Sequence, residues 1–209
     1  MLDDDCELAE KNALLTINSL FETKPNTGLI SIKVQYFQNG QMQVNAFPHK
    51  NFNKFKDQTS FETYYFAGGA HAIKKEAMEA VGGYPTDFFY GMEEYDLSYK
   101  LLDQGYKIIY TDQVVMLHKE SPEGRSPHKE KTKMLWLNKT KVAWRYLPIF
   151  YFISTAVMWS IEYLRKTSFD WSGYFKGWVF IFQSTIKEDR KPLKKSTMDY
   201  LKKVEARLW

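Results

Sequence analysis

A cluster of three carboxylates, Glu93, Glu94 and Asp96, limits how this chain can fold more than any other feature. Leucines follow the cluster at the spacing of one helical face: Leu97, Leu101 and Leu102. Gly105 then stands where a left-handed cap would end the helix. The acids therefore belong to the first helical turn, where unpaired N–H groups and the helix dipole favour an ionised carboxylate by roughly 0.3–1 kcal/mol. Capping explains one or two acids, most simply Asp96, but not the aromatic residues 88–90 that lead into them, which indicate a pocket wall.

The composition describes a folded chain with two differently charged parts. Of its 209 residues, 44% are hydrophobic and 17% aromatic, which excludes a disordered tail and allows one domain with an appendage. Residues 1–118 carry 10 Lys and Arg against 16 Asp and Glu, whereas residues 119–209 carry 19 against 9. A basic part rich in Trp and Tyr suits nucleic acid or an anionic membrane surface. The single cysteine, Cys6, excludes a disulfide framework and favours a reducing cytosolic setting, and the first residues do not resemble a signal peptide.

The first 118 residues predict an α/β fold with a mixed sheet. Strands are expected over 2–5, 29–37, 63–66, 106–110 and 114–117. Helices are expected over 7–21 and 74–81, besides the helix that starts with the acidic cluster. Residues 41–61 carry scattered Phe side chains among Asn and Lys, and they are predicted to form a long functional loop whose aromatic rings can stack on sugars.

The polar segment after His118 marks a change of domain. We expect residues 1–133 to form the catalytic-core portion and residues 134–209 to form a helical extension. The uncharged run 146–161 has 16 residues, fewer than the about 20 that a helix needs to span a bilayer. Flanking cations, Trp and Tyr suit a helix that lies in the membrane interface, and residues 171–183 repeat this character before a basic helical tail. The alternative is that both runs simply pack on the domain.

One chemical function should explain four polar features of the sequence. They are Asp3-Asp4-Asp5 at an expected strand end, Gly68-Gly69 after a strand, the acidic cluster, and His118 at a strand end. Each alone has a plainer explanation, because a run of Asp is usually a solvated charge run, a Gly pair a turn, and a lone His a hydrogen-bonded structural residue. Their order along the chain is more specific than any one of them.

In this order the chain resembles the family 2 glycosyltransferases of the A-type fold, which are inverting enzymes that use nucleotide sugars. The resemblance runs from Leu2 to about Arg145. It is densest in the segments 68–84, 88–97, 105–108 and 114–118. It implies a hexosyl- or deoxyhexosyltransferase that takes a nucleotide-sugar donor and a lipid-linked or cell-surface glycan as acceptor.

The resemblance also implies a metal site. The Asp-rich motif of the family holds a divalent cation, Mg²⁺ or Mn²⁺, against the nucleotide diphosphate. This carries over as metal ligation by Asp3 and Asp5 and substrate binding by Asp3 and Asp4. A histidine after the last strand can complete the metal site in the family, which points to His118. A hard cation held by carboxylate oxygens neutralises the charge on the leaving diphosphate, an effect typically worth several kcal/mol.

The acid–base chemistry falls to the acidic cluster. Register with the acidic pair of the family places the general base at Glu94, which would accept the proton of the acceptor hydroxyl, a contribution of about 10²–10⁴-fold. Asp96 is expected beside it among the catalytic residues, binding the acceptor or positioning the helix, and Glu93 is expected to bind substrate. Gly68 and Gly69 would let the backbone approach a sugar closely because no Cβ intervenes.

The sequence departs from the family pattern in two places. Leu137-Asn138 stands where the family commonly has Arg-Asn. The first strands of the fold, which bind the base and ribose of the nucleotide, precede the Asp-rich motif in the family, but here that motif begins at residue 3. We therefore expect a partial A-type fold with an exposed sheet edge, and weak nucleotide-sugar binding and uncertain activity for this chain alone.

Three other functions fit parts of the sequence. One is a non-catalytic, membrane-associated remnant of such an enzyme, which the reading frame upstream of Met1 would discriminate. Another is a glycoside hydrolase, which also needs two carboxylates but has no use for the triple Asp and His118. A metal-independent activity that survives substitution of Asp5 or His118 would favour it. A nucleic-acid binder ranks last because no nucleic-acid recognition module is identifiable in the sequence.

The sequence thus predicts a glycosyltransferase on the cytoplasmic face of the membrane, docked by its C-terminal helices and without a nucleic-acid partner.

Overall fold

The computed structural model describes residues 4–119 and 128–209. The chain divides into two compact units. The first unit comprises Met1–Gly83, Leu97–Pro122 and Lys195–Ala206, and the second comprises Tyr84–Asp96, Glu123–Lys194 and Arg207–Trp209. The first turn of helix α4 (Glu93–Asp103) belongs to the second unit, and the rest of this helix belongs to the first unit. The expected boundary between residues 133 and 134 falls inside helix α5 (His128–Tyr146) and stays a prediction.

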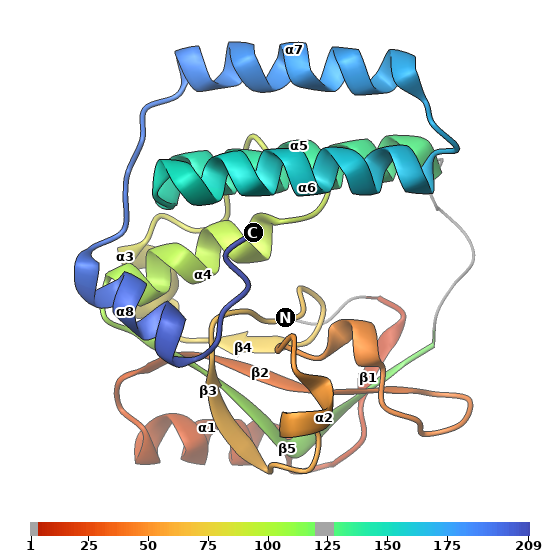
Figure 1. Cartoon of the computed structure of the whole chain (residues 1–209). Coiled ribbons are helices and arrows are strands. Elements are labelled where there is room, and N and C mark those ends of the chain that lie inside the picture. The colour runs from red at the N-terminus through yellow and green to blue at the C-terminus, as the bar shows by residue number, and fades with distance from the viewer. Residues whose placement is uncertain (1–3, 120–127) are drawn as a thin grey trace. The chain divides into compact units, whose positions relative to one another are not determined.

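The first unit is built on a mixed sheet of five strands, as predicted (Figure 1). Strand β5 (Lys107–His118) is central and runs parallel to β2 (Thr27–Tyr36). The other edge of β5 is shared by β3 (Ser60–Thr63) and β1 (Cys6–Leu8), both antiparallel to it. Strand β4 (His71–Ile73) pairs antiparallel with β2. The strand pairings of the sheet therefore involve β2 or β5.

Several elements of the first unit differ from the sequence prediction. Strand β3 covers residues 60–63 where a strand was expected over 63–66, and strand β4 was not expected at all. Residues 107–118 form one strand where two were expected, because the register against β2 shifts between the pairs Ile32–Thr111 and Lys33–Val115 and the strand continues beyond this irregularity. The first strand was expected to end at residue 5, but β1 begins at Cys6, where the backbone pairs with His118. Helix α1 (Ala13–Thr23) consequently begins later than residue 7.

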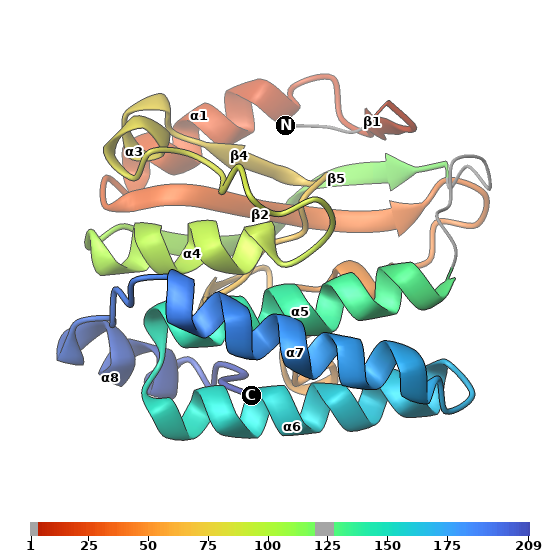
Figure 2. The same cartoon turned by 90° about the horizontal axis from the view of Figure 1, so that it is seen from above.

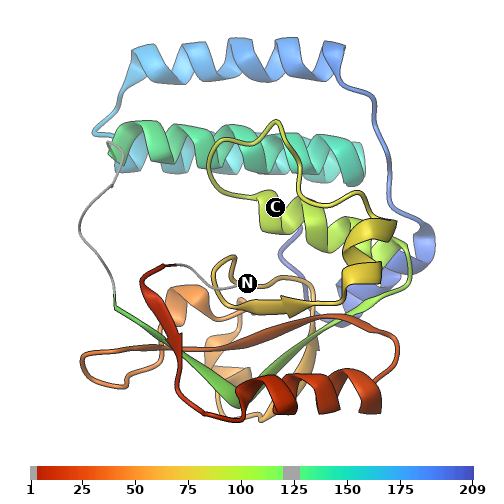
Figure 3. The same cartoon turned by 180° about the vertical axis from the view of Figure 1, so that it is seen from behind.

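The two faces of the sheet bury different clusters. One face packs against α1, which lies along it in Figure 3. The cluster there includes Ala13, Ile30, Ile32, Val34, Ile109 and Met116. Neighbouring residues of a strand point to opposite faces, so Tyr110 instead joins Phe47 and Phe61 in a second cluster beside the 3-10 turn η1 (Val44–Ala46) and α2 (Phe52–Phe55). The expectation that loop aromatics stack on sugars is wrong for Phe47 and Phe61, because both are buried.

Helix α4 ends as the sequence predicts. Gly105 has a φ of 90°, and its N–H donates to the carbonyl of Leu102 at 3.0 Å. The N–H of Tyr106 donates to the carbonyl of Leu101 at 3.1 Å, which completes a Schellman motif. Short helices α3 (Lys75–Ala80) and α8 (Lys195–Lys203) complete the first unit, and Thr197 of α8 donates to Asp103 at the end of α4 at 2.7 Å.

Three long helices make up most of the second unit (Figure 2). After α5, Pro148 precedes α6 (Ile149–Lys166), and α7 (Trp171–Lys187) follows. Trp136 of α5 is fully buried among Tyr163, Tyr174 and Trp178, and its ring lies so near Gly177 that a Cβ there would meet it at 2.1 Å. Among the described residues, no helix is both long and apolar enough to cross a membrane.

Candidate functional site

The expected metal ligands Asp5 and His118 meet where β1 pairs with β5. Cys6 is the register partner of His118, and the N–H of Lys119 donates to the carbonyl of Asp5 at 2.9 Å. This pairing places the Oδ2 of Asp5 3.3 Å from the Nε2 of His118. Both side chains are about one quarter exposed, at 27% and 25%, so a ligand can reach them from solvent. The structure therefore brings these two predicted ligands together, and their role in metal binding stays a prediction.

Two neighbours of this pair were not predicted. The amide oxygen of Gln43 lies 3.1 Å from the Nδ1 of His118, and Gln43 itself is buried. The Nδ1–H of His118 can donate to this oxygen, which leaves Nε2 on the side of Asp5. The Cys6 thiol lies 3.5 Å from the Oδ1 of Asp5. Gln43 carried no sequence signal because it is distant from both partners along the chain, whereas Cys6 is the direct neighbour of Asp5.

The donor atoms of this group fit a divalent cation. One ligand atom each from Asp5, Cys6 and His118 lies within 4.8 Å of the others. A carboxylate oxygen and an oriented imidazole nitrogen are ligands for many divalent metals, whereas a thiol does not suit Mg²⁺ or Mn²⁺. Asp5 and His118 alone would leave coordination positions for water or phosphate oxygens. Asp3 lies outside the described residues, and Asp4 is exposed in a turn.

Gly68 and Gly69 occupy the turn between β3 and β4. The N–H of Ala70 closes this turn by donating to the carbonyl of Ala67 at 3.0 Å. His71 follows at the start of β4, where it is only 2% exposed. Burial lowers the pKa of His71 to about 4, so the ring is neutral at pH 7.

The acidic cluster lies in the first turn of α4, as predicted. The carbonyl of Met92 accepts hydrogen bonds from the N–H groups of Tyr95 at 3.1 Å and Asp96 at 3.3 Å, which starts the helix at Glu93. Glu94 is partly exposed. The Oε2 of Glu93 is buried and has no hydrogen-bond partner within the described part of the chain. The predicted pocket wall does not include Phe89, which is 88% exposed.

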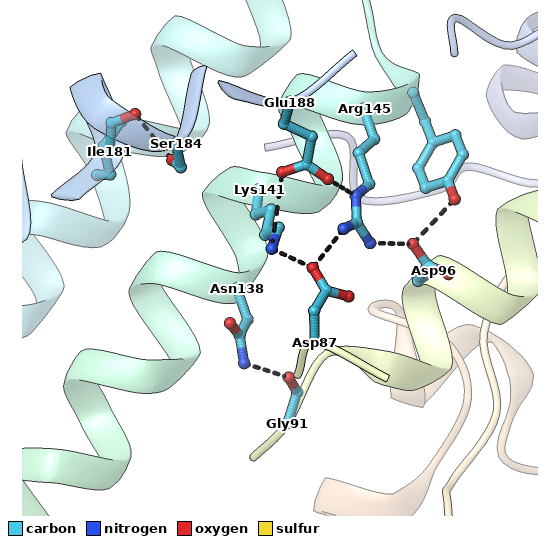
Figure 4. A network of polar contacts seen from close by, with 10 residues as sticks. Asp87, Gly91, Asp96, Asn138, Lys141, Arg145, Ile181, Ser184 and Glu188 are labelled. Carbon is cyan, nitrogen blue, oxygen red and sulfur yellow. Dashed lines mark hydrogen bonds and ion pairs between the residues drawn. The ribbon is translucent and has the colours of Figure 1, made fainter. Parts of the chain in front are cut away.

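Asp96 is the most buried acid of the cluster, with 1% exposure. One of its oxygens accepts hydrogen bonds from the Nη1 of Arg145 and the hydroxyl of Tyr146, both at 2.9 Å (Figure 4). Burial, together with the Asp96 carboxylate, raises the pKa of Tyr146 well above its usual value, so the hydroxyl stays protonated and donates. This placement favours the positioning role for Asp96 over direct contact with a substrate.

Arg145 joins Asp96 to two further carboxylates of the second unit. Its Nη2 lies 2.6 Å from Asp87, and its Nε donates to Glu188. Although burial favours the neutral form, the hydrogen bonds with Glu188 and Asp96 raise the pKa of Arg145 above its usual value. Burial also raises the pKa of Asp87, but Lys141 and Arg145 more than offset it and hold that pKa below the usual range. Sequence reasoning missed this network, since its members are scattered between residues 87 and 188.

The structure thus forms two groups from the predicted site residues. Asp5 and His118 come together in the first unit, which also holds the Gly68-Gly69 turn. Glu93, Glu94 and Asp96 form the second group, at the start of α4 in the second unit.

Comparison with known proteins bears on both groups. A family model described as the N-terminal domain of galactosyltransferase matches residues 43–120. This segment is therefore similar in sequence to that glycosyltransferase domain. It contains Gly68-Gly69, the acidic cluster and His118, whereas Asp3-Asp4-Asp5 lies before it. A search of the curated proteins found no match.

Solved structures with a similar backbone include GalNAc-T7 with UDP, GalNAc and Mn²⁺. Sequence identity is 18% and the TM-score is 0.47, values too low to support an argument about function. The similarity covers 68% of this chain and 30% of that chain, so the present sequence spans less than a third of that protein.

Proposed function

We propose that this chain is part of a metal-assisted, inverting glycosyltransferase of the A-type fold, related to family 2. The observation that carries the proposal is the family match over 43–120, because this one segment contains the acidic cluster, the Gly turn and His118. The Asp5–His118 pair adds independent support, since β1 brings a carboxylate from outside the matched segment to that histidine.

In the proposed reaction, the hydroxyl of an acceptor glycan attacks the anomeric carbon of a nucleotide sugar, and the nucleoside diphosphate leaves from the opposite face. Glu94 takes the hydroxyl proton. Glu93 binds the acceptor, and Asp96 holds the first turn of α4 in place through Arg145 and Tyr146. Asp5 and His118 would hold Mn²⁺ or Mg²⁺, which when bound neutralises the leaving diphosphate. The acceptor is a lipid-linked or cell-surface glycan.

Donor hydrolysis tests the proposal. We expect the chain, with Mn²⁺ and a panel of nucleotide sugars that begins with UDP-galactose because of the family match, to release the nucleoside diphosphate. Substitution Glu94→Gln should lower kcat for transfer to an acceptor by about 10²–10⁴-fold, because the amide cannot accept the proton.

Glu79→Gln is the matched control, since Glu79 is exposed on α3, where it pairs with Lys75 at 3.7 Å. Equal transfer rates for wild type and Glu94→Gln would contradict the role of Glu94. A metal-independent activity that survives Asp5→Asn would favour a glycoside hydrolase. Absence of turnover with every donor, also for a longer form of the protein, would favour a non-catalytic remnant.

The second unit supports a proposal about location. Helices α6 and α7 expose large apolar side chains: Ile149, Phe150, Ile153, Val157, Met158, Ile161, Trp171, Phe175, Val179, Phe180, Phe182 and Ile186. Exposed cations lie among or beside them at Arg165, Lys166, Lys176 and Lys187. Aromatic and apolar side chains flanked by cations suit the interface of an anionic membrane. We therefore propose that the protein works on the cytoplasmic face of a membrane, where a lipid-linked acceptor would be presented.

A further inference from the structure

A side chain of α5, Asn138, bonds to the backbone that leads into the acidic cluster. The Nδ2 of Asn138 donates to the carbonyl of Tyr90 at 3.0 Å and to the carbonyl of Gly91 at 3.1 Å. Figure 4 shows the bond to Gly91 crossing from α5 to the loop. Both acceptors are backbone atoms, so Asn138 fixes the course of the chain immediately before α4.

The backbone at this point adopts an uncommon conformation. Gly91 and Met92 both have a φ of 74°, in the left-handed region. A Cβ on Gly91 would clash with the Cδ2 of Leu135 unless that side chain moved, and the positive φ itself favours glycine. Met92 pays a steric penalty there because it has a Cβ, and such residues persist only where the surroundings determine their conformation. The carbonyl of Met92 then starts the helix that carries Glu93 and Glu94.

Lys139, the next residue of α5, contacts Tyr95, the residue that directly follows the acidic pair Glu93-Glu94. The Nζ of Lys139 lies 3.0 Å from the ring centroid of Tyr95 and has no hydrogen-bond partner within the described residues. Lys139 is buried, with 3% exposure, and this burial lowers its pKa well below the usual value, so the side chain packs against the ring without a full cation–π contribution. Two consecutive residues of α5 therefore hold the chain before and after Glu93 and Glu94.

We propose that Asn138 is a positioning residue that sets the direction of Glu94 by holding the backbone of Tyr90 and Gly91. This inference rests on the proposed function for its consequence in catalysis, but its structural part does not. The family pattern has Arg-Asn where this chain has Leu137-Asn138, and here the amide acts on the backbone that precedes the base.

Substitution Asn138→Asp tests the inference, because it keeps the shape and replaces the donor by an oxygen that repels the two carbonyls. We expect amide hydrogen exchange in residues 92–96 to become at least tenfold faster, while exchange in α7 stays unchanged. We also expect kcat for transfer to fall at least tenfold, with KM for the donor unchanged within about twofold. Asn138→Ala removes the donor without adding charge and should give a smaller change in the same direction.

Asn18→Asp is the matched control, because Asn18 is exposed on α1, where its amide donates to Glu22 at 2.7 Å. Unchanged exchange in residues 92–96 for both Asn138 variants, with the fold intact by circular dichroism, would overturn the inference. A fall in kcat without faster exchange would also overturn it. If wild type shows no turnover, the proposed function fails, while the exchange measurement still decides whether Asn138 holds this segment.

Discussion

At the scale of the residue, Arg145 has the largest expected effect on stability. It is buried to 15% side-chain exposure and contacts Asp87, Asp96 and Glu188. Removing one member of a buried ionic group leaves the remaining charges uncompensated, which typically costs about 3–5 kcal/mol. We expect Arg145→Leu to lower the free energy of unfolding by that amount in urea denaturation. Arg165→Leu, at a site exposed to 73%, is the control and should change it by less than about 1 kcal/mol. A loss below about 1 kcal/mol for Arg145→Leu would contradict this account of the network.

The lowered pKa of the buried His71 side chain predicts how the free energy of unfolding depends on pH. Its pKa is about 4 in the folded chain and about 6.5 when unfolded. As the pH falls, His71 therefore gains its proton in the unfolded state before it does in the folded state. Its contribution to the free energy of unfolding is fully present above about pH 6.5 and declines towards pH 4. The decline due to this residue is about 3 kcal/mol. We expect His71→Asn to remove that part of the slope when urea unfolding is compared at pH 7, 5.5 and 4. An identical slope in wild type and variant would contradict the burial argument.

At the scale of the element, the sequence predicted helices better than strand limits. The helix that begins at Glu93 follows from its leucines and from Gly105, both of which act locally. The limits of β1 and β5 depend on pairing between segments about a hundred residues apart, which local pattern does not contain. For the same reason the meeting of Asp5 with His118 needed a family resemblance to be expected, whereas Gln43 and the Arg145 network were missed.

The apolar face of α6 and α7 predicts membrane binding. We expect the protein to sediment with vesicles that contain anionic phospholipid, and to bind purely zwitterionic vesicles more weakly, because both apolar burial and cations contribute. The double substitution Phe175→Asp and Phe182→Asp should reduce sedimentation strongly, since these side chains are 63% and 68% exposed. Asp substitution at Ser172, exposed at the start of α7, is the control. If the wild type dimerises in solution and does not bind vesicles, this face serves a second copy and the membrane proposal fails.

At the scale of the whole molecule, each unit carries one of the two groups of predicted site residues. The Asp5–His118 pair belongs to the first unit and Glu94 to the second. The sequence segment that matches the galactosyltransferase description contains both His118 and Glu94. The claim on which the catalytic roles depend is that Asp5 and His118 share one cation.

That claim is tested most directly by electron paramagnetic resonance of free Mn²⁺ titrated with the protein in the presence of UDP. We predict about one bound Mn²⁺ per chain. We also predict a loss of affinity of tenfold or more for Asp5→Asn and for His118→Ala, and no change for the exposed control Asp57→Asn. Equal Mn²⁺ affinity in all four proteins would contradict the claim.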